Sequence, residues 1–300
     1  MENRTKQKSM RLMQTHNVKV TPYLFIGPFL VFYIVFFIVP SAYSLVLSFF
    51  QYRGYGNAVF VGLKNYIALF QYSYFYSTLY NVFFYYIVHT IPMLALSFML
   101  AYLLYSKYVG ISLKRTYKAC IFLPQIMALV CAALVFRVVF ATNSGVVNKW
   151  LGTSIPFLER PLLMKLAVVV LIIWRGTGWY MIIFLSGLSG LDNSVLEAAV
   201  IDGVSGWQKM RYVVLPLMKP VLLLALVFET IGSLKISVEP NMLISGWINA
   251  PESAAPVINV VLDNIRGGSF GMASAAGWIL TVIILLITLI QMRLSGKDEI

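Results

Sequence analysis

The sequence predicts an all-α protein that crosses a membrane several times. Its 300 residues are 60% hydrophobic and only 11% charged, whereas soluble proteins average about 25% charged residues. Several apolar runs reach the roughly 20 residues that a helix needs to cross the hydrocarbon of a bilayer. The net charge of +12 comes largely from Lys and Arg in short segments beside these runs. This pattern is typical of membrane topology and not of a nucleic-acid partner.

Six membrane spans follow from the apolar runs, at about residues 23–50, 78–105, 119–140, 163–188, 216–238 and 272–292. The first run is too long for a signal peptide, and no small-residue cleavage site follows it. We therefore expect residues 1–22 to form a basic cytoplasmic tail and residues 23–300 to form one transmembrane domain. Alternation of the spans places both termini and residues 189–215 in the cytoplasm. The inner segments then hold about twice as many Lys and Arg residues as the outer ones, as expected for a bacterial-type plasma (inner) membrane.

A polar stretch, Asn193–Pro216, lies between the fourth and fifth expected spans. Two short helices around Gly203 fit it best, because glycine supplies the flexible turn. Ser194 is expected to cap the first helix, and Glu197 three residues later would complete a capping box. The apolar face of this helix, with Ala198, Ala199 and Val200 or Ile201, indicates that the loop docks on something. The alternative is a capped surface loop without a partner, in which Glu197 only caps and Asp202 only braces the turn.

The same stretch resembles the signature loop of ABC-importer permeases. Glu197-Ala198-Ala199 is followed after three residues by Gly203, and nine residues later by Val213-Val214-Leu215-Pro216, where Val213 replaces the usual Ile. Four further segments resemble this family: Asn81, Arg115-Thr116, Phe122-Leu123-Pro124 and Phe270–Ala275. Within the family, the match is closest to the branch of maltose and glycerol-phosphate transporter permeases, as indicated by Tyr23–Pro28, Gly62–Tyr66 and Ser233-Leu234-Lys235. One departure is Gly246–Pro251, where that branch often has a Gly-Gly-Pro turn. The resemblance covers most of the chain.

The resemblance implies a transport subunit and not an enzyme. Such a permease works with a second homologous permease, as a heterodimer, with two cytoplasmic ATPase subunits and with an extracytoplasmic sugar-binding protein. ATP and Mg would be held by the ATPases, because this sequence contains no G-x-x-x-x-G-K-[ST] motif. The resemblance also implies that the loop seats on the ATPases and passes their rigid-body movement to the spans. The residues implied in this coupling are Glu197, Ala198, Ala199, Ile201, Asp202, Gly203, Leu215 and Pro216.

Ionisable residues inside the expected spans are the candidates for the substrate path. Arg175 lies about halfway along the fourth span and Glu229 a little past halfway along the fifth. Because these spans flank the same loop, the two side chains are expected to lie near each other. They either form a buried ion pair or line a cavity that binds sugar hydroxyls or an acidic group. The full candidate set is Arg175, Trp179, Tyr180, Glu229, Ser233, Lys235 and Glu239.

Other features favour structural roles. Trp179 and Tyr180 are expected to anchor the helix at the membrane interface, with stacking on sugar rings as the functional alternative. Gly176, Gly178, Gly187 and Gly190 are expected to allow close helix packing. His89 is interpreted as a packing histidine, with a position on the substrate path as the alternative. Two alternative functions remain open: import of a non-sugar solute such as a polyamine or phosphate, and a membrane-embedded transferase. The transferase would need clustered acidic or His residues at a membrane face, and the sequence has no such cluster.

Overall fold

The computed structural model describes residues 23–105, 110–246 and 250–295. The basic tail expected at residues 1–22 lies outside the described residues. Four described helices are long and apolar enough to cross a membrane. They are Tyr23–Leu47, α4 (Ser73–Tyr105), α8 (Pro161–Ser189) and α15 (Phe270–Ser295). The first of them contains the π-helix η1 (Ile34–Ile38) and α2 (Val39–Leu47). The chain is therefore a helical protein with several candidate membrane spans, as the composition predicts.

The third and fifth expected spans are bent pairs of helices, which the sequence analysis did not predict. The third consists of α5 (Ile111–Ile126) and α6 (Leu129–Val139), with an angle of 95° between them. Pro124 removes a hydrogen-bond donor near the end of α5, and Met127 and Ala128 are extended, with ψ of 140° and 126°. With each bent pair counted as one crossing, the described residues contain up to six spans.

The fifth expected span bends by 68° between Gly206–Leu217 and α12 (Lys219–Ser233), next to Pro220. Its first part comprises α10 (Gly206–Lys209), the π-helix η2 (Met210–Val214) and α11 (Leu215–Leu217). α12 ends at Ser233 and not near residue 238, whereas α4 begins five residues before the expected position 78. The short helix α9 (Asn193–Ile201) connects α8 to this region.

The remaining elements belong to the segments expected outside the membrane. They are β1 (Phe50–Gln51), β2 (Val59–Phe60), α3 (Lys64–Phe70), α7 (Val146–Leu151), α13 (Val238–Pro240), the π-helix η3 (Asn241–Ser245) and α14 (Val257–Arg266). The two strands are antiparallel, with Phe50 opposite Phe60. Asn81 and Tyr85 of α4 fix the segment before α14. The Asn81 side-chain amide donates to the carbonyls of Glu252 and Ala255 at 2.8 and 3.0 Å, and the Tyr85 hydroxyl donates to that of Ala254 at 2.8 Å.

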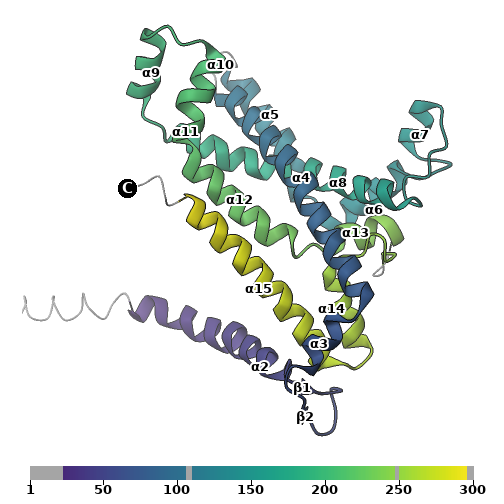
Figure 1. Ribbon diagram of the computed structural model, residues 1–300. Helices are drawn as coiled ribbons and strands as arrows, with labels where there is room; N and C mark the ends of the chain where they lie inside the picture. The colour runs from purple at the N-terminus through teal and green to yellow at the C-terminus, as the bar shows by residue number, and fades with distance from the viewer. Residues whose placement is uncertain (1–22, 106–109, 247–249, 296–300) are drawn as a thin grey trace, which may run out of the picture.

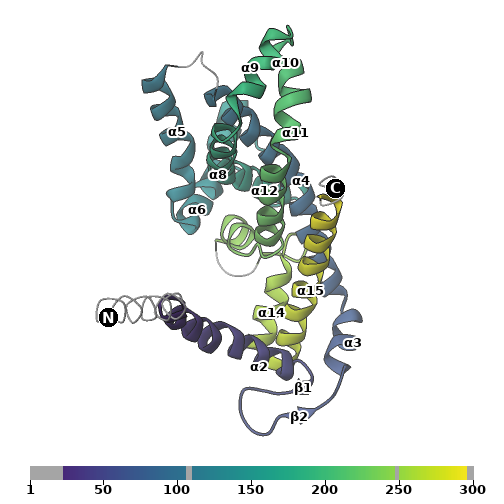
Figure 2. The ribbon, with the colours of Figure 1, turned by 90° about the vertical axis from the view of Figure 1, so that its left-hand side faces the viewer.

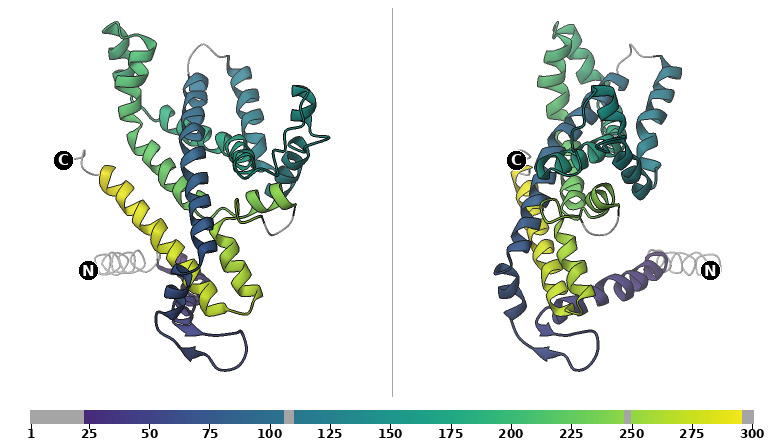
Figure 3. Two further views of the ribbon diagram at one scale, coloured as in Figure 1. Left: turned by 45° about the vertical axis from the view of Figure 1, so that its right-hand side comes forward. Right: turned by 90° about the vertical axis from the view of Figure 1, so that its right-hand side faces the viewer.

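The helices form an elongated bundle with α9 and α10 at one end and the β1–β2 hairpin at the other (Figure 1). Figure 3 shows from two further sides that α9 and α10 extend past the other helices. The first helix diverges from the bundle (Figure 2), and its most apolar window has no buried residue. Its contact with the bundle is made by α2, which lies against α15. The long helices α4 and α8 pack along each other and form the centre of the structure.

Three of the four glycines that we expected at helix contacts are there. A Cβ atom at Gly178 would collide with the backbone of Ile121 in α5, one at Gly176 with the sulfur of Met93 in α4, and one at Gly187 with Met218. Gly190 is different, because it caps the C-terminus of α8 and its nearest neighbours are carbonyls of its own helix. The close approach of α5 to α8 at Gly178 brings Gln125 and Arg175 to one cavity.

Candidate functional site

The loop between α8 and α10 is capped differently from the predicted scheme. Asp192, and not Ser194, caps α9: its carboxylate accepts a hydrogen bond from the Ser194 backbone N–H at 2.8 Å. This bond lowers the pKa of the exposed Asp192 carboxyl group. The capping box lies on α10 instead. The Gln208 backbone N–H donates to Ser205 Oγ, and the Ser205 backbone N–H donates to Gln208 Oε1. The turn at Gly203 is confirmed, since its φ is +71°.

The outward apolar face of the loop also differs in part from the expectation. Ile201 and Val200 are 85% and 61% exposed, whereas Ala199 is only 7% exposed because it packs inward with Leu196. Trp207 of α10 adds a 66% exposed ring that the sequence analysis did not include. Lys209 Nζ donates to the Leu196 carbonyl at 2.9 Å and ties the two helices together. Glu197, Ala198, Asp202, Gly203 and Pro216 are exposed, and Leu215 is half-buried.

A cavity of about 260 Å³ lies where α4, α5, α8, α12 and α13 meet. Six of the seven substrate-path candidates line it: Arg175, Trp179, Tyr180, Glu229, Ser233 and Glu239. Lys235 does not line this cavity, and its side chain is exposed beyond the end of α12. The other lining residues are His89, Met93, Gln125, Leu171, Ile172, Gly176, Gly232 and Ile236. The cavity therefore joins residues from distant parts of the chain.

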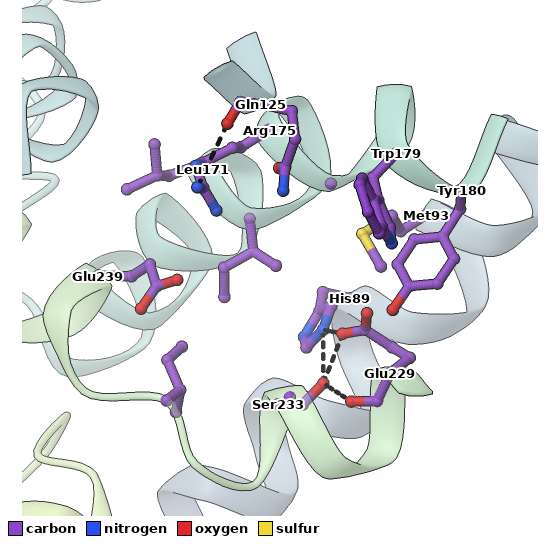
Figure 4. Close-up of a pocket in the computed structure, with 14 residues that line it drawn as sticks. His89, Met93, Gln125, Leu171, Arg175, Trp179, Tyr180, Glu229, Ser233 and Glu239 are labelled. Carbon is purple, nitrogen blue, oxygen red and sulfur yellow. Dashed lines mark hydrogen bonds and ion pairs between the residues drawn. The ribbon is translucent and has the colours of Figure 1, made fainter. Parts of the chain in front are cut away.

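One side of the cavity is a closed hydrogen-bond network (Figure 4). His89 Nε2 lies 2.6 Å from Glu229 Oε1 and 3.1 Å from Ser233 Oγ, and the Tyr180 hydroxyl points toward the same carboxylate. His89 Nδ1 contacts the Tyr85 carbonyl, which can only accept, so Nδ1 carries a proton. A proton must also lie between Nε2 and Oε1, because two lone pairs at this distance would repel. The pair is therefore neutral overall, either as imidazolium and carboxylate or as imidazole and carboxylic acid.

The other side of the cavity has unused hydrogen-bonding groups. Arg175 Nη2 makes a long contact of 3.4 Å to the Gln125 carbonyl, while Arg175 Nε and Gln125 Oε1 are buried without a partner. Figure 4 shows Glu239 facing the cavity on the same side as Arg175. Among the described residues, the ion partner of Glu229 is His89 and not Arg175. The interpretation of Arg175 and Glu229 as a buried ion pair is therefore wrong, although both line the same cavity.

His89 was interpreted first as a packing histidine and only second as a residue of the substrate path, yet it lines the cavity. The available signal was its position inside a span, because an ionisable residue at membrane depth is a candidate by default. Its distance of 140 positions from Glu229 along the chain concealed the pairing. Both side chains are buried, with 0% and 7% of their surface exposed.

Removing the His89 side chain is expected to destabilise the folded protein. In His89→Ala, Glu229 would remain buried without its partner, which typically costs about 3–5 kcal/mol. The thermal midpoint of the detergent-solubilised variant, followed by size-exclusion chromatography, should fall by several degrees. Lys235→Ala is the matched control, because Lys235 is exposed, and it should leave the midpoint unchanged. An unchanged midpoint for His89→Ala would contradict a structural contribution of the network.

Comparisons with known proteins define the family. Residues 66–296 match the family described as "Binding-protein-dependent transport system inner membrane component", and the chain belongs to this family. It is 29% identical to the lactose transport system permease protein LacF of Rhizobium radiobacter, over 91% of this chain and 93% of LacF. It is 30% identical to the arabinooligosaccharides transport system permease protein AraP of Halalkalibacterium halodurans, over 97% of this chain and 92% of AraP.

The fold is also shared with solved structures. A crystal structure of a bacterial ABC transporter involved in the import of the acidic polysaccharide alginate matches with a TM-score of 0.80 at 20% identity. The match covers 97% of this chain and 100% of the matched one. A second structure, the alginate transporter in complex with an alginate pentasaccharide-bound periplasmic protein, matches with a TM-score of 0.79 at 21% identity, over 94% and 96% of the two chains. The chain is thus a multi-pass membrane permease of an ABC importer, a transport subunit and not itself an enzyme.

Proposed function

We propose that this chain forms half of the pore of an ATP-driven importer for a sugar or oligosaccharide delivered by an extracytoplasmic binding protein. The relatives that are named for their substrates support this class: lactose for LacF and arabino-oligosaccharides for AraP. The observation that carries the proposal is the cavity with unused polar groups beside an aromatic ring. Arg175 and Gln125 have unpaired atoms there, and Trp179 lies across from them.

The chemistry of the cavity fits a sugar. The guanidinium N–H groups of Arg175 can donate hydrogen bonds to sugar hydroxyl oxygens. The amide oxygen of Gln125 and the carboxylate of Glu239 can accept hydrogen bonds from sugar hydroxyls. An aromatic ring offers an apolar face for the C–H side of a pyranose. The neutral His89–Glu229 pair with Ser233 would form the opposite wall. Arg175, Trp179, Tyr180, Glu229, Ser233 and Glu239 would then line the substrate path, with Lys235 at its outer entrance.

The loop of α9 and α10 would transmit the energy of ATP hydrolysis. Its exposed Val200, Ile201 and Trp207 form an apolar surface on a segment that otherwise carries charges, and such surfaces mark protein contacts. We assign this surface to a cleft on a cytoplasmic ATPase subunit, with Glu197 and Asp202 toward basic groups. Gly203 would permit the turn, and Leu215 and Pro216 would join the loop to the next span. ATP and Mg would bind to the two ATPase subunits.

The assembly that we propose contains a second, homologous but different permease chain beside this one. Residues 23–300 would form a single transmembrane domain with six spans, two of them bent. The N- and C-termini and the α9–α10 loop would be cytoplasmic, because the basic residues concentrate on that side. The β1–β2 hairpin and α14, at the opposite end of the bundle (Figure 1), would face the binding protein.

Co-purification with the partner subunits, followed by an ATPase screen, tests this function. The complex in lipid nanodiscs, with its binding protein, should hydrolyse ATP faster when its sugar is present. Polyamines and phosphate should give no stimulation. Stimulation by a polyamine or phosphate but by no saccharide would overturn the sugar assignment, and a chain that purifies without an ATPase subunit would contradict the importer assembly.

A further inference from the structure

A second cavity, separate from the substrate path, contains a buried cation without an anionic partner. Lys165 of α8 is only 9% exposed. Among the described residues, no acceptor or carboxylate contacts its ammonium group within hydrogen-bond or ion-pair distance. It lies instead over the rings of Tyr80 and Phe84, with Nζ 4.8 and 5.2 Å from their centroids. Ring contacts stabilise a cation by only about 0.5–2 kcal/mol and leave its N–H groups unpaired. A buried lysine that keeps its charge is stabilised by an anion.

The cavity beside Lys165 has a fixed shape. Its volume is about 600 Å³, and its walls include Ser77, Tyr80, Asn81, Pro161, Lys165, Glu252 and Ser253. The Glu252–Ser253 segment is held over α4 by the hydrogen bonds from Asn81 and Tyr85. On the other wall, the rings of α4 hold Lys165. The site is therefore built by hydrogen bonds and packing that do not involve the ammonium group itself.

The charges around this cavity point to a zwitterionic ligand. Glu252 lines the same cavity as Lys165, yet the two side chains do not form an ion pair in the described structure. A phosphate oxygen would satisfy the buried Lys165, with hydroxyl donors available at Ser77 and Ser253. A neighbouring ammonium group would pair with the carboxylate of Glu252, which is exposed at the rim of the cavity. A purely anionic ligand would be repelled by the Glu252 carboxylate.

The surroundings of the cavity favour a membrane lipid as the source of this group. Tyr76, Tyr80 and Leu162 around it are 50%, 64% and 58% exposed, and they lie near the ends of α4 and α8 that we assign to the outer side. Tyrosines at this level are typical of the membrane–water interface, where phospholipid head groups lie. Basic pockets between spans bind lipid head groups on the cytoplasmic side of membranes, and Lys165 offers the same charge-assisted pairing with a phosphate on the outer side. We propose that this cavity binds the phosphoethanolamine head group of an outer-leaflet phospholipid, with its phosphate on Lys165 and its ammonium on Glu252.

Native mass spectrometry of the purified complex tests the lipid site. Wild-type complex, delipidated and then titrated with phosphatidylethanolamine, should bind it about tenfold more tightly than Lys165→Met complex, which loses the charge-assisted bonds but keeps an apolar stem. Lys165→Arg should retain binding. Lys149→Met, at an exposed cation of α7, is the matched control and should bind like wild type. The thermal midpoints of the variants distinguish loss of the site from loss of the fold. The proposal requires that Lys165→Met binds the lipid more weakly at an unchanged midpoint, or that Lys165→Arg restores the binding.

Two further arms identify the ligand. Phosphatidylglycerol, which lacks the ammonium group, should bind wild type more weakly than phosphatidylethanolamine, and Glu252→Gln should abolish this preference. Inorganic phosphate alone should not displace the lipid. Equal lipid binding by wild type and Lys165→Met, or a preference of wild type for phosphatidylglycerol, would overturn the proposal. If inorganic phosphate displaced the lipid, free phosphate and not a lipid would be the ligand of Lys165. Displacement of bound phosphatidylethanolamine by the binding protein would likewise contradict a lipid ligand.

Discussion

Gly203→Asp is expected to abolish uptake while the protein still inserts into the membrane. Gly203 has a φ of +71°, and a Cβ atom there would meet nothing within 4 Å. A left-handed conformation costs an L-residue about 1–2 kcal/mol, and Asp tolerates it better than most residues. The isolated chain should therefore fold. The new carboxylate would instead lie at the turn of the loop that we assign to the ATPase, where volume and charge prevent docking. Uptake by intact cells should fall to background, with membrane levels of the chain unchanged.

A second glycine provides the matched control for this experiment. Gly152 follows α7 in a segment that we assign to the outer side, has a φ of +65° and likewise has nothing within 4 Å of a built Cβ. Gly152→Asp introduces the same side chain with the same backbone strain, far from the coupling loop, and should transport normally. If Gly203→Asp cells imported the sugar at the wild-type rate, the docking role of the loop would be refuted.

Arg175→Ala is expected to reduce transport much more than assembly. Its only hydrogen bond among the described residues is the 3.4 Å contact to Gln125, and it has no carboxylate partner within ion-pair distance. Removing it should therefore cost little stability. A lost charge-assisted hydrogen bond to substrate is worth about 1.5–3 kcal/mol, which corresponds to at least about a tenfold decrease in transport rate. Initial uptake rates, normalised to the amount of complex in the membrane, measure this effect.

Two variants delimit the role of Arg175. Arg175→Lys keeps the charge but not the planar fork, so it should restore part of the rate. Lys235→Ala removes a basic residue that does not line the cavity, and it should have the smaller effect. Disappearance of the whole complex from the membrane in Arg175→Ala would mean that Arg175 holds the helices together, contrary to its contacts here.

The parts of the molecule that the sequence predicted are those set by local pattern. Apolar run length identified the chain as a helical protein with several candidate spans, and the residues between the fourth and fifth runs form the short helices α9 and α10 around Gly203. Position along the fourth and fifth spans selected Arg175, Trp179, Tyr180, Glu229 and Ser233, which line one cavity, because two spans that flank the same loop are expected to lie near each other. Glu239, chosen for the outer vestibule, lines the same cavity. Lys235 was the exception, since its side chain is exposed just beyond the end of α12 at Ser233.

The parts that were missed depend on contacts between distant segments. The pairing of His89 with Glu229 requires α4 and α12 to be adjacent, which no local pattern reveals. Ala199 was assigned to the outward face of α9, but its side chain is buried. The cap on Asp192 was overlooked because Ser194 and Glu197 also satisfy the capping-box spacing. The 95° bend at Met127 and Ala128 lies three residues after Pro124, and proline marks such a site without fixing its angle.

Uptake of a labelled sugar by proteoliposomes tests the central claim most directly. The vesicles would contain this chain, its partner permease and the ATPase subunits, in complexes whose ATPase subunits face the lumen. ATP would be enclosed in the lumen, and the binding protein would be added outside. We expect the sugar to accumulate inside above its external concentration, only when ATP and the binding protein are both present. Sugar that merely equilibrates across the membrane, at the same rate with and without ATP, would contradict the account.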